Sequence, residues 1–233
     1  MSTIAGNLQA VEATIETACR AANRPRSTVQ LLAVSKTFPA EAVLEAAACG
    51  QRAFGENYLQ EGVDKIAAVA KALPDTPLAW HFIGPIQSNK TRPIAASFSW
   101  VHTVERLKIA QRLSEQRPPE LGPLNICLQV NISGEASKSG VTPEELPALA
   151  QAVAALPNLR LRGLMAIPEP QEDPERQREP FARLRELAQA IVKSGIQLDT
   201  LSMGMSGDMR AAVMEGATIV RVGSAIFGAR HYE

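Results

Sequence analysis

Residues 29–50 read VQLLAVSKTFPAEAVLEAAACG, and this stretch holds one complete strand-to-helix unit. Val29 to Val34 form a short apolar run rich in β-forming residues, which predicts a strand. A helix is expected to begin near Pro39, because proline suits the first turn of a helix, and to end at Gly50, which suits the left-handed C-cap. The next apolar run follows directly.

The same unit recurs along the whole chain, because short apolar runs alternate with stretches of helical periodicity. Strict alternation of this kind predicts a parallel sheet. Eight units in 233 residues favour an α/β fold of the closed (β/α)8 TIM-type barrel over an open doubly wound sheet. The predicted strands are Val29–Val34, Arg52–Gly55, Ala79–Ile83, Trp100–Thr103, Leu124–Asn131, Leu159–Ile167, Leu198–Leu201 and Thr218–Val222.

An extra helix is predicted ahead of the first strand, because Ile4, Leu8, Val11 and Ile15 recur at spacings of three and four. We expect it to act as a lid on the main fold. Residues 168–174 are polar and rich in proline, which indicates a surface loop and not a domain boundary. Residues 1–233 are therefore expected to form a single barrel domain.

Composition excludes several classes of partner. The 24 basic and 24 acidic side chains cancel, so we expect no binding to nucleic acid or to anionic membranes. Cys19, Cys49 and Cys127 form no paired motif and resemble reduced core cysteines, and no targeting or membrane-spanning segment is evident, so a cytoplasmic location is expected. The three histidines lack metal-ligand spacing, and no metal is predicted.

Lys36 is the candidate nucleophile. It directly follows the first predicted strand, and in a (β/α)8 barrel the residues just after each strand form the active face. A lysine at the mouth of a barrel loses part of its hydration, which favours the neutral amine that attacks carbonyl groups. The alternative is an ordinary solvated loop lysine, and Lys36 alone does not distinguish the two.

Small hydroxyl residues and glycines follow the seventh and eighth predicted strands. Ser206, Gly223 and Ser224 are the candidate phosphate ligands, since barrels commonly bind phosphate in these two loops. Serines and glycines also serve as helix caps and turn residues, and the spacing supports both interpretations equally.

Arg221 is expected to point into the barrel mouth, because the flanking valines of the eighth strand would face outward. An inward arginine needs a partner. One that fits is the ring nitrogen of a pyridine cofactor, which arginine would keep unprotonated. A salt bridge to a carboxylate such as Glu56 is an equally good interpretation.

Three further residues at strand ends carry weaker signals. Asn57, His81 and Met165 could line a pocket, although a lone histidine is more often a satisfied core residue and a methionine more often fills a core. Glu56 and Asp208 are similarly ambiguous.

Seven motifs together resemble the pyridoxal phosphate homeostasis protein family, and they run from Ala33 to Arg230 in the family's order. They are A-V-S-K-T (33–37), F-G-E-N-Y-x-Q-E (54–61), W-H-F-I-G-x-x-Q-x-N-K (80–90), S-K-x-G (137–140), R-G-L-M-A-I (162–167), S-M-G-M-S-x-D-M (202–209) and V-R-V-G-S-A-I-F-G-A-R (220–230).

The resemblance implies a barrel like the N-terminal domain of alanine racemase, with pyridoxal 5'-phosphate as the cofactor. It implies a Schiff base on Lys36, Arg221 at the pyridine nitrogen and no established catalytic activity, the protein instead buffering or delivering the cofactor. The remaining implied residues are the phosphate ligands Ser206, Gly223 and Ser224 and the secondary pocket residues Asn57, His81, Met165, Ser202 and Met203.

Phe38 and Lys138 also bear on the comparison with similar proteins. Similar proteins often carry a second lysine two places after the Schiff-base lysine, where this chain has Phe38. Lys138, in the S-K-x-G motif, looks like a family lysine that could hold cofactor at a secondary site.

Two enzymatic alternatives remain at this point. The first is a pyridoxal phosphate-dependent amino-acid racemase, although alanine-type racemases use a second β-rich domain and a catalytic tyrosine, whereas this chain has only Tyr58 and Tyr232. The second is a Schiff-base aldolase without cofactor. For the carrier, the expected partners are pyridoxal phosphate and apo forms of the enzymes that use it, and a monomer is expected.

Overall fold

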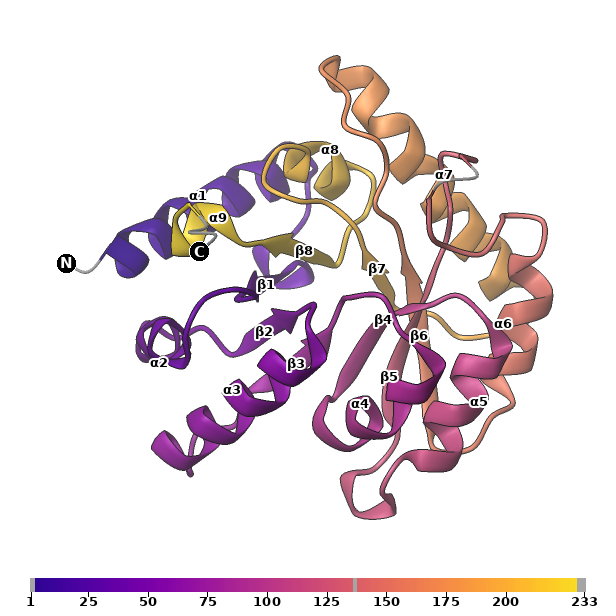
Figure 1. Cartoon of the computed structure of the whole chain (residues 1–233). Helices are drawn as coiled ribbons and strands as arrows, with labels where there is room; N and C mark the ends of the chain where they lie inside the picture. Colours follow the sequence, from indigo (N-terminus) through magenta and orange to yellow (C-terminus); the bar gives the residue numbers. More distant parts are fainter. Residues whose placement is uncertain (1–2, 136–137, 230–233) are drawn as a thin grey trace.

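The computed structural model describes residues 3–135 and 138–229, and its centre is a closed barrel of parallel strands (Figure 1). Each strand pairs with the next along the chain, and β8 closes the ring by pairing with β1. The predicted (β/α)8 barrel is thus confirmed. The strands are β1 (Gln30–Val34), β2 (Ala53–Glu56), β3 (Ala79–Phe82), β4 (Trp100–Val104), β5 (Leu124–Gln129), β6 (Leu159–Met165), β7 (Thr200–Ser202) and β8 (Ile219–Val222).

Helices surround the barrel, and each strand leads into a helical segment. Pro39 is the N-cap of the helix after β1, and Gly50 just beyond that helix has the left-handed φ of 96° that the sequence predicted. The helices after β1 to β8 are α2 (Ala40–Ala48), α3 (Leu59–Ala72), α4 (Thr91–Ser97), α5 (Leu107–Gln116), α6 (Leu146–Ala154), α7 (Pro174–Lys193), α8 (Met209–Met214) and α9 (Ser224–Phe227), with short 3₁₀ turns at Arg26–Thr28, Ser88–Lys90 and Pro119–Leu121.

The N-terminal helix α1 (Thr3–Ala21) lies in the outer ring of helices, where it packs beside α8, α9 and α2 (Figure 1). The side chain of Asn7 donates a hydrogen bond of 2.8 Å to the carbonyl of Ile226 in α9. Because α9 has only four residues, α1 covers the side of the barrel that a longer helix after β8 would cover. The extra helix was predicted correctly, but its interpretation as a lid is wrong.

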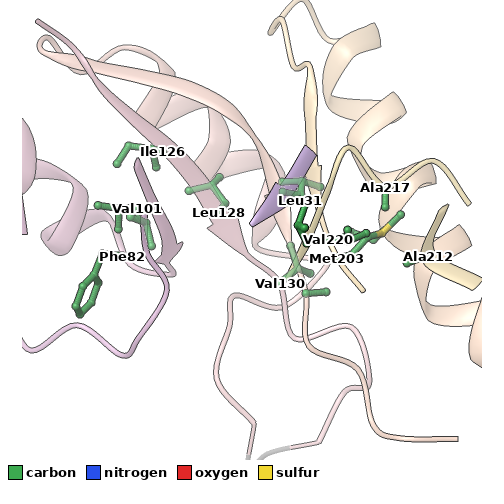
Figure 2. Packing of buried hydrophobic residues seen from close by; sticks show 14 of the residues in the cluster. Leu31, Phe82, Val101, Ile126, Leu128, Val130, Met203, Ala212, Ala217 and Val220 are labelled. Atoms are coloured by element: carbon green, nitrogen blue, oxygen red, sulfur yellow. The ribbon is translucent and has the colours of Figure 1, made fainter. Parts of the chain in front are cut away.

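Side chains alternate between the two faces of each strand, and this alternation divides the apolar residues into two clusters. The larger cluster fills the layer between barrel and helices, where Figure 2 shows Leu31, Leu128 and Val220 among its members. The smaller one lies inside the barrel and consists of Leu32, Val34, Ala53, Ile83 and Ile219.

A polar cluster lies at the end of the barrel at which the strands begin. Arg162 donates two hydrogen bonds of 2.9 Å to Asp199 and one of 2.9 Å to the side chain of Asn125. Its guanidinium also lies 4.6 Å from the centroid of the Trp100 ring, a cation–π contact. The opposite end, where the strands terminate, is the end at which parallel barrels bind their ligands.

All three cysteines are free thiols. Cys19 and Cys127 are buried as predicted, whereas Cys49 is exposed at the end of α2, so its assignment to the core is wrong. None of the described helices combines the length and apolarity needed to span a lipid bilayer.

Gly163 in β6 allows the barrel to close, because a Cβ atom there would lie 1.7 Å from the backbone oxygen of Thr200 in β7. We expect Gly163→Ala to lower the free energy of unfolding by about 3 kcal/mol, measured by urea denaturation. The matched control is Gly6→Ala in α1, where a Cβ meets nothing within 4 Å. That substitution should raise stability by about 0.5 to 1 kcal/mol, and equal effects of the two changes would contradict the argument.

Candidate functional site

Lys36 lies at the open end of the barrel, two residues beyond the last residue of β1. Leu32 and Val34 face the interior, so alternation brings Lys36 to the inward side and Ser35 to the side of the helices. Lys36 is half-buried, whereas Ser35 is fully buried. The two neighbours therefore belong to different environments.

The backbone on both sides of Lys36 is held by a buried ionic cluster that we call the α3 cluster, made of Glu56, Glu61 and Lys65. The ammonium of Lys65 donates to the Ser35 carbonyl (2.8 Å), to Glu56 Oε1 (2.7 Å) and to Glu61 Oε1 (2.9 Å). The hydroxyl of Ser35 donates to the same Glu56 oxygen at 2.6 Å. The cluster thus anchors the end of β1 to α3.

Thr37, the residue after Lys36, has a left-handed φ of 67° that is unfavourable for a β-branched residue. Its amide donates a hydrogen bond of 2.6 Å to Glu61 Oε1, an atom of the α3 cluster. This bond stabilises the turn that carries the lysine.

Glu56 is therefore not the partner of Arg221. Burial raises the pKa of the Glu56 carboxyl, and the neighbouring Lys65 ammonium and Ser35 hydroxyl oppose that effect. Glu56 Oε2 has no hydrogen-bond partner among the described residues. The ion pair between Lys65 and Glu56 Oε1 is therefore the main stabilisation of the carboxylate. The salt bridge between Glu56 and Arg221 considered from the sequence is absent, because the two side chains lie on opposite faces of the barrel wall.

Arg221 is buried inside the barrel, as its position in β8 predicted. One guanidinium nitrogen donates to the hydroxyl of Ser202 at 2.8 Å and the other to the carbonyl of Ala166 at 3.1 Å. Burial lowers the pKa of Arg221 to about 10, and the nearby Asp208 opposes this effect. The group stays charged at neutral pH.

His81 and Ser202 also lie inside the barrel, where a histidine from β4, His102, joins them. His81 Nδ1 lies 2.8 Å from His102 Nε2, and His102 Nδ1 lies 2.8 Å from Ser202 Oγ. Burial lowers the pKa of His81 to about 3. Burial, His81 and Arg221 together lower the pKa of His102 well below its usual range. Both imidazoles are therefore neutral at physiological pH.

The predicted phosphate ligands lie in the loops after β7 and β8, at the same end of the barrel as the lysine. Ser206 and Ser224 are exposed, and Gly223 lies against the end of β1, where its Cβ position would be 3.2 Å from the Val34 oxygen. Asp208 accepts a hydrogen bond of 2.6 Å from the Met205 amide, which fixes the turn that contains Ser206. Of the three predicted ligands, Gly223 is thus the one that lies against the end of β1.

Asn57 and Met165 lie at the ends of two further strands, β2 and β6. The Oδ1 atom of Asn57 is buried without a hydrogen-bond partner among the described residues, and Asn57 lines a cleft of about 250 Å³ together with Thr103 and Gln129. Met165 is paired with Ser202 in the sheet register, so its side chain is on the same inward face.

Met203, by contrast, does not belong to this group. Its buried side chain packs between the strands and α8, next to Ala212, Ala217 and Val220 (Figure 2). Its prediction as a pocket residue is therefore wrong for the side chain. Sequence alternation could have excluded it, since the inward Ser202 precedes it directly.

Phe38 and Lys138 lie in two different loops, between β1 and α2 and between β5 and α6. The Phe38 ring packs against Phe227 of α9, with ring centroids 5.2 Å apart, so an aromatic contact occupies the position of the second lysine of similar sequences. Lys138 is exposed in the loop between β5 and α6, and Ser137 beside it lies outside the described residues.

A larger cavity of about 710 Å³ lies at the opposite end of the barrel, between residues 159–162 and 195–199. We place the site at the mouth instead, because ligands of parallel barrels bind where the strands terminate, and Lys36 and Arg221 converge there. Among the described residues, His, Cys, Asp and Glu side chains form no group of three that could hold a metal ion.

Known proteins match this chain over nearly its whole length. Residues 6–231 match the model of the family described as alanine racemase, N-terminal domain. The pyridoxal phosphate homeostasis protein of Pseudomonas aeruginosa is 66% identical over 232 residues, which cover 100% of this chain and 98% of the relative. The chain belongs to the pyridoxal phosphate homeostasis protein family.

Solved structures extend the comparison. The structure of PipY from Synechococcus elongatus with pyridoxal phosphate bound has a TM-score of 0.81 and 37% identity, and the match covers 97% of this chain and 100% of PipY. Alanine racemase from Corynebacterium glutamicum shares the fold, with a TM-score of 0.70 at 18% identity, but the match covers only 61% of the racemase. The barrel of this family thus corresponds to one part of the racemase.

Three residues in the buried polar contacts near Lys36 and Arg221 were missed from the sequence. His102 occupies an inward position of β4. The alternation of the strand could have revealed it, because His102 comes two residues after Trp100 and therefore lies on the same face. Lys65 and Glu61 lie one turn apart in a helix with many polar residues, so an ordinary i,i+4 surface pair was the natural expectation. Their partner Glu56 comes from a different element, which no local pattern shows.

The α3 cluster predicts a large stability effect at Lys65. Lys65→Met should destabilise the protein by about 3 to 5 kcal/mol, because it leaves the buried Glu56 carboxylate without its counter-ion. Adding Glu56→Gln should restore part of this loss. Urea denaturation measures both, with the exposed Lys71→Met on the same helix as a matched control that should change little. A Lys65→Met variant as stable as the control would contradict the role of the cluster.

The buried histidines predict a pH dependence of stability. Their pKa values are lowered in the folded protein, to about 3 for His81, and lie near 6.5 when unfolded, so the unfolded state takes up protons first as the pH falls. Their contribution is complete above pH 6.5 and decreases below it by about 1.4 kcal/mol per pH unit and histidine.

Urea denaturation at pH 7.5 and 5.5 measures this decrease. Comparison of the wild type with His102→Asn separates the contribution of His102 to this loss of stability from that of carboxylates that titrate in the same pH range. The variant should lose less stability on acidification than the wild type by about 1.4 kcal/mol. Identical losses would show that His102 is not held neutral.

Proposed function

We propose that this chain binds pyridoxal 5'-phosphate as a Schiff base on Lys36 and acts in cofactor homeostasis, holding and delivering the cofactor, without established catalytic turnover. The observation that carries the proposal is the convergence of Lys36, the buried Arg221 and the two hydroxyl loops at one end of the barrel. Pyridoxal phosphate bound to PipY and the names of the close relatives support it.

The residues fit the chemistry of this cofactor. It offers an aldehyde for the lysine amine, a ring nitrogen that accepts a hydrogen bond, and a phosphate that needs several donors. Arg221 is a donor that stays charged at neutral pH, while Ser206 and Ser224 present exposed hydroxyls on the loops after β7 and β8. Asn57, whose Oδ1 has no hydrogen-bond partner within residues 3–135 and 138–229, adds a polar atom at the mouth.

Each group has a defined role in binding. The amine of Lys36 forms the covalent link with loss of water, and the α3 cluster orients the backbone that carries it. Ser206, Gly223 and Ser224 hold the phosphate, and Arg221 donates to the ring nitrogen. Once bound, the cofactor supplies a ring that withdraws electrons. Arg221 weakens this effect, because a guanidinium only donates hydrogen bonds and so keeps the ring nitrogen of the cofactor unprotonated.

The surroundings favour a carrier over a racemase. Racemisation needs proton donors and acceptors on both faces of the reacting carbon. Burial raises the pKa of the Cys127 thiol to about 12, and the two interior histidines are held neutral by their lowered pKa values. Of the two tyrosines, Tyr58 is exposed and Tyr232 lies outside the described residues.

The recipients of the cofactor in this proposal are apo forms of pyridoxal phosphate-dependent enzymes. A monomer with the barrel mouth accessible suits such delivery. Lys138, exposed in the β5–α6 loop, is a candidate secondary position for the cofactor.

The test is the visible absorbance of the purified protein with pyridoxal phosphate, followed by borohydride reduction and mass spectrometry of peptides. We expect a visible band and one reduced adduct on Lys36, both lost in Lys36→Ala and both kept in the control Lys108→Ala, which changes an exposed lysine of α5. A minor adduct on Lys138 would support the secondary position. Adducts spread over surface lysines would overturn the proposal and favour the Schiff-base aldolase.

The carrier assignment has a separate test. The loaded wild type should exchange no α-proton of alanine or other amino acids in deuterated water and should release cofactor to an apo enzyme. Rapid α-proton exchange that is lost in Lys36→Ala would replace the carrier with the racemase.

A further inference from the structure

Four buried polar side chains form a continuous hydrogen-bond chain across the inside of the barrel, which we call the interior chain. It runs from Arg221 on β8 through Ser202 on β7 and His102 on β4 to His81 on β3, with donor–acceptor separations of 2.8 Å at each of its three links. All four are at most 5% exposed. Polar groups this deeply buried are costly unless each proton has a defined acceptor.

Arg221 fixes the direction of the first link in the interior chain, because a guanidinium can only donate. The Ser202 hydroxyl that accepts from Arg221 could accept a second hydrogen bond, but its own proton has an acceptor in the interior chain only when it points to His102 Nδ1. His102 Nδ1 is then an acceptor, and the ring carries its proton on Nε2, which donates to His81 Nδ1. The proton of His81 is left on Nε2, the atom that has no partner among the described residues.

We propose that His102 is a positioning residue for Arg221: by accepting the Ser202 proton, it orients the hydroxyl lone pair that fixes the guanidinium. The proposal rests on the proposed function, because the group that Arg221 would face is the ring nitrogen of pyridoxal phosphate. Arg221 has a second fixed contact, to the Ala166 carbonyl, and two contacts set the plane of its fork. The remaining donors then point in a defined direction.

Without His102, the Ser202 proton has no acceptor on that side. The hydroxyl can then turn its proton toward Arg221, where it opposes the guanidinium and leaves it free to rotate. A leucine at this position would also place an apolar group against the hydroxyl. The consequence is a less well oriented donor at the ring nitrogen, while the lysine at β1 is unaffected.

The first experiment reads the tautomers directly in the protein without added cofactor. The chain has three histidines, so two-bond ¹H–¹⁵N correlation spectra of ¹⁵N-labelled protein contain three ring patterns, and His231→Gln identifies the one outside the interior chain. At pH 7 we expect His81 and His102 to be neutral with the proton on Nε2. A proton on Nδ1 of His102, or a charged ring, would overturn the proposal.

The second experiment uses pyridoxal phosphate with His102→Leu and His102→Asn. The asparagine oxygen stands near the position of Nδ1 and keeps an acceptor for Ser202, whereas leucine removes it. We expect His102→Leu to bind the cofactor about tenfold more weakly and to shift the visible band, because one charge-assisted hydrogen bond is weakened. His102→Asn should stay close to wild type in both respects.

The two proposals fail in different ways. An adduct on Lys36 with the same affinity and band in wild type and His102→Leu would overturn the role of His102 and leave the cofactor site intact. Equal losses of cofactor affinity in His102→Leu and His102→Asn would show that packing, and not hydrogen-bond direction, is the cause. That result would also overturn the role of His102. Absence of any adduct on Lys36 in the wild type would overturn the cofactor site itself.

Discussion

Closure of the parallel ladder between β1 and β8 is the constraint on which the remaining structure depends. In a closed barrel every strand has one face inside and one face against the helices, and consecutive residues must alternate between them. Ser35 and Lys36 show the effect most directly. Ser35 donates a hydrogen bond to Glu56 of the α3 cluster outside the barrel, while Lys36, the next residue, is on the inward side.

Two buried polar systems follow from this division, and they are chemically different. Outside the barrel, the α3 cluster neutralises charge with charge and holds the backbone around Lys36. Inside, the interior chain holds a single cation, Arg221, among neutral groups whose lowered histidine pKa values exclude further positive charge. The wall of the barrel, a single layer of backbone, separates the two. A lysine and an arginine are thus prepared by independent sets of contacts.

The sequence predicted those features that depend on local pattern. Alternating apolar runs were sufficient for the barrel, and the ends of the predicted strands were sufficient to place Lys36 and Ser206 at the rim where the strands terminate, because strand ends in a parallel barrel all meet at one face. Arg221 was predicted to face inward because the valines beside it had to face outward. Features that depend on pairs of distant elements were missed, such as Lys65 with Glu56 and His102 with Ser202. The lid interpretation of α1 was wrong for the same reason, since the place of α1 depends on the shortness of α9 at the far end of the chain.

The pairing of Gln30 with Ile219 has a consequence during synthesis on the ribosome. β1 is among the first strands to emerge, yet its second neighbour β8 is among the last, so one edge of the growing sheet stays unpaired through most of translation. Unpaired parallel edges and slow long-range closure are the conditions under which nascent chains associate wrongly. The loops that follow β7 and β8 emerge in the same final interval. The newly made chain therefore acquires its ring closure and the loops proposed to hold the phosphate almost together, so the proposed site is complete only in a chain that has closed its barrel.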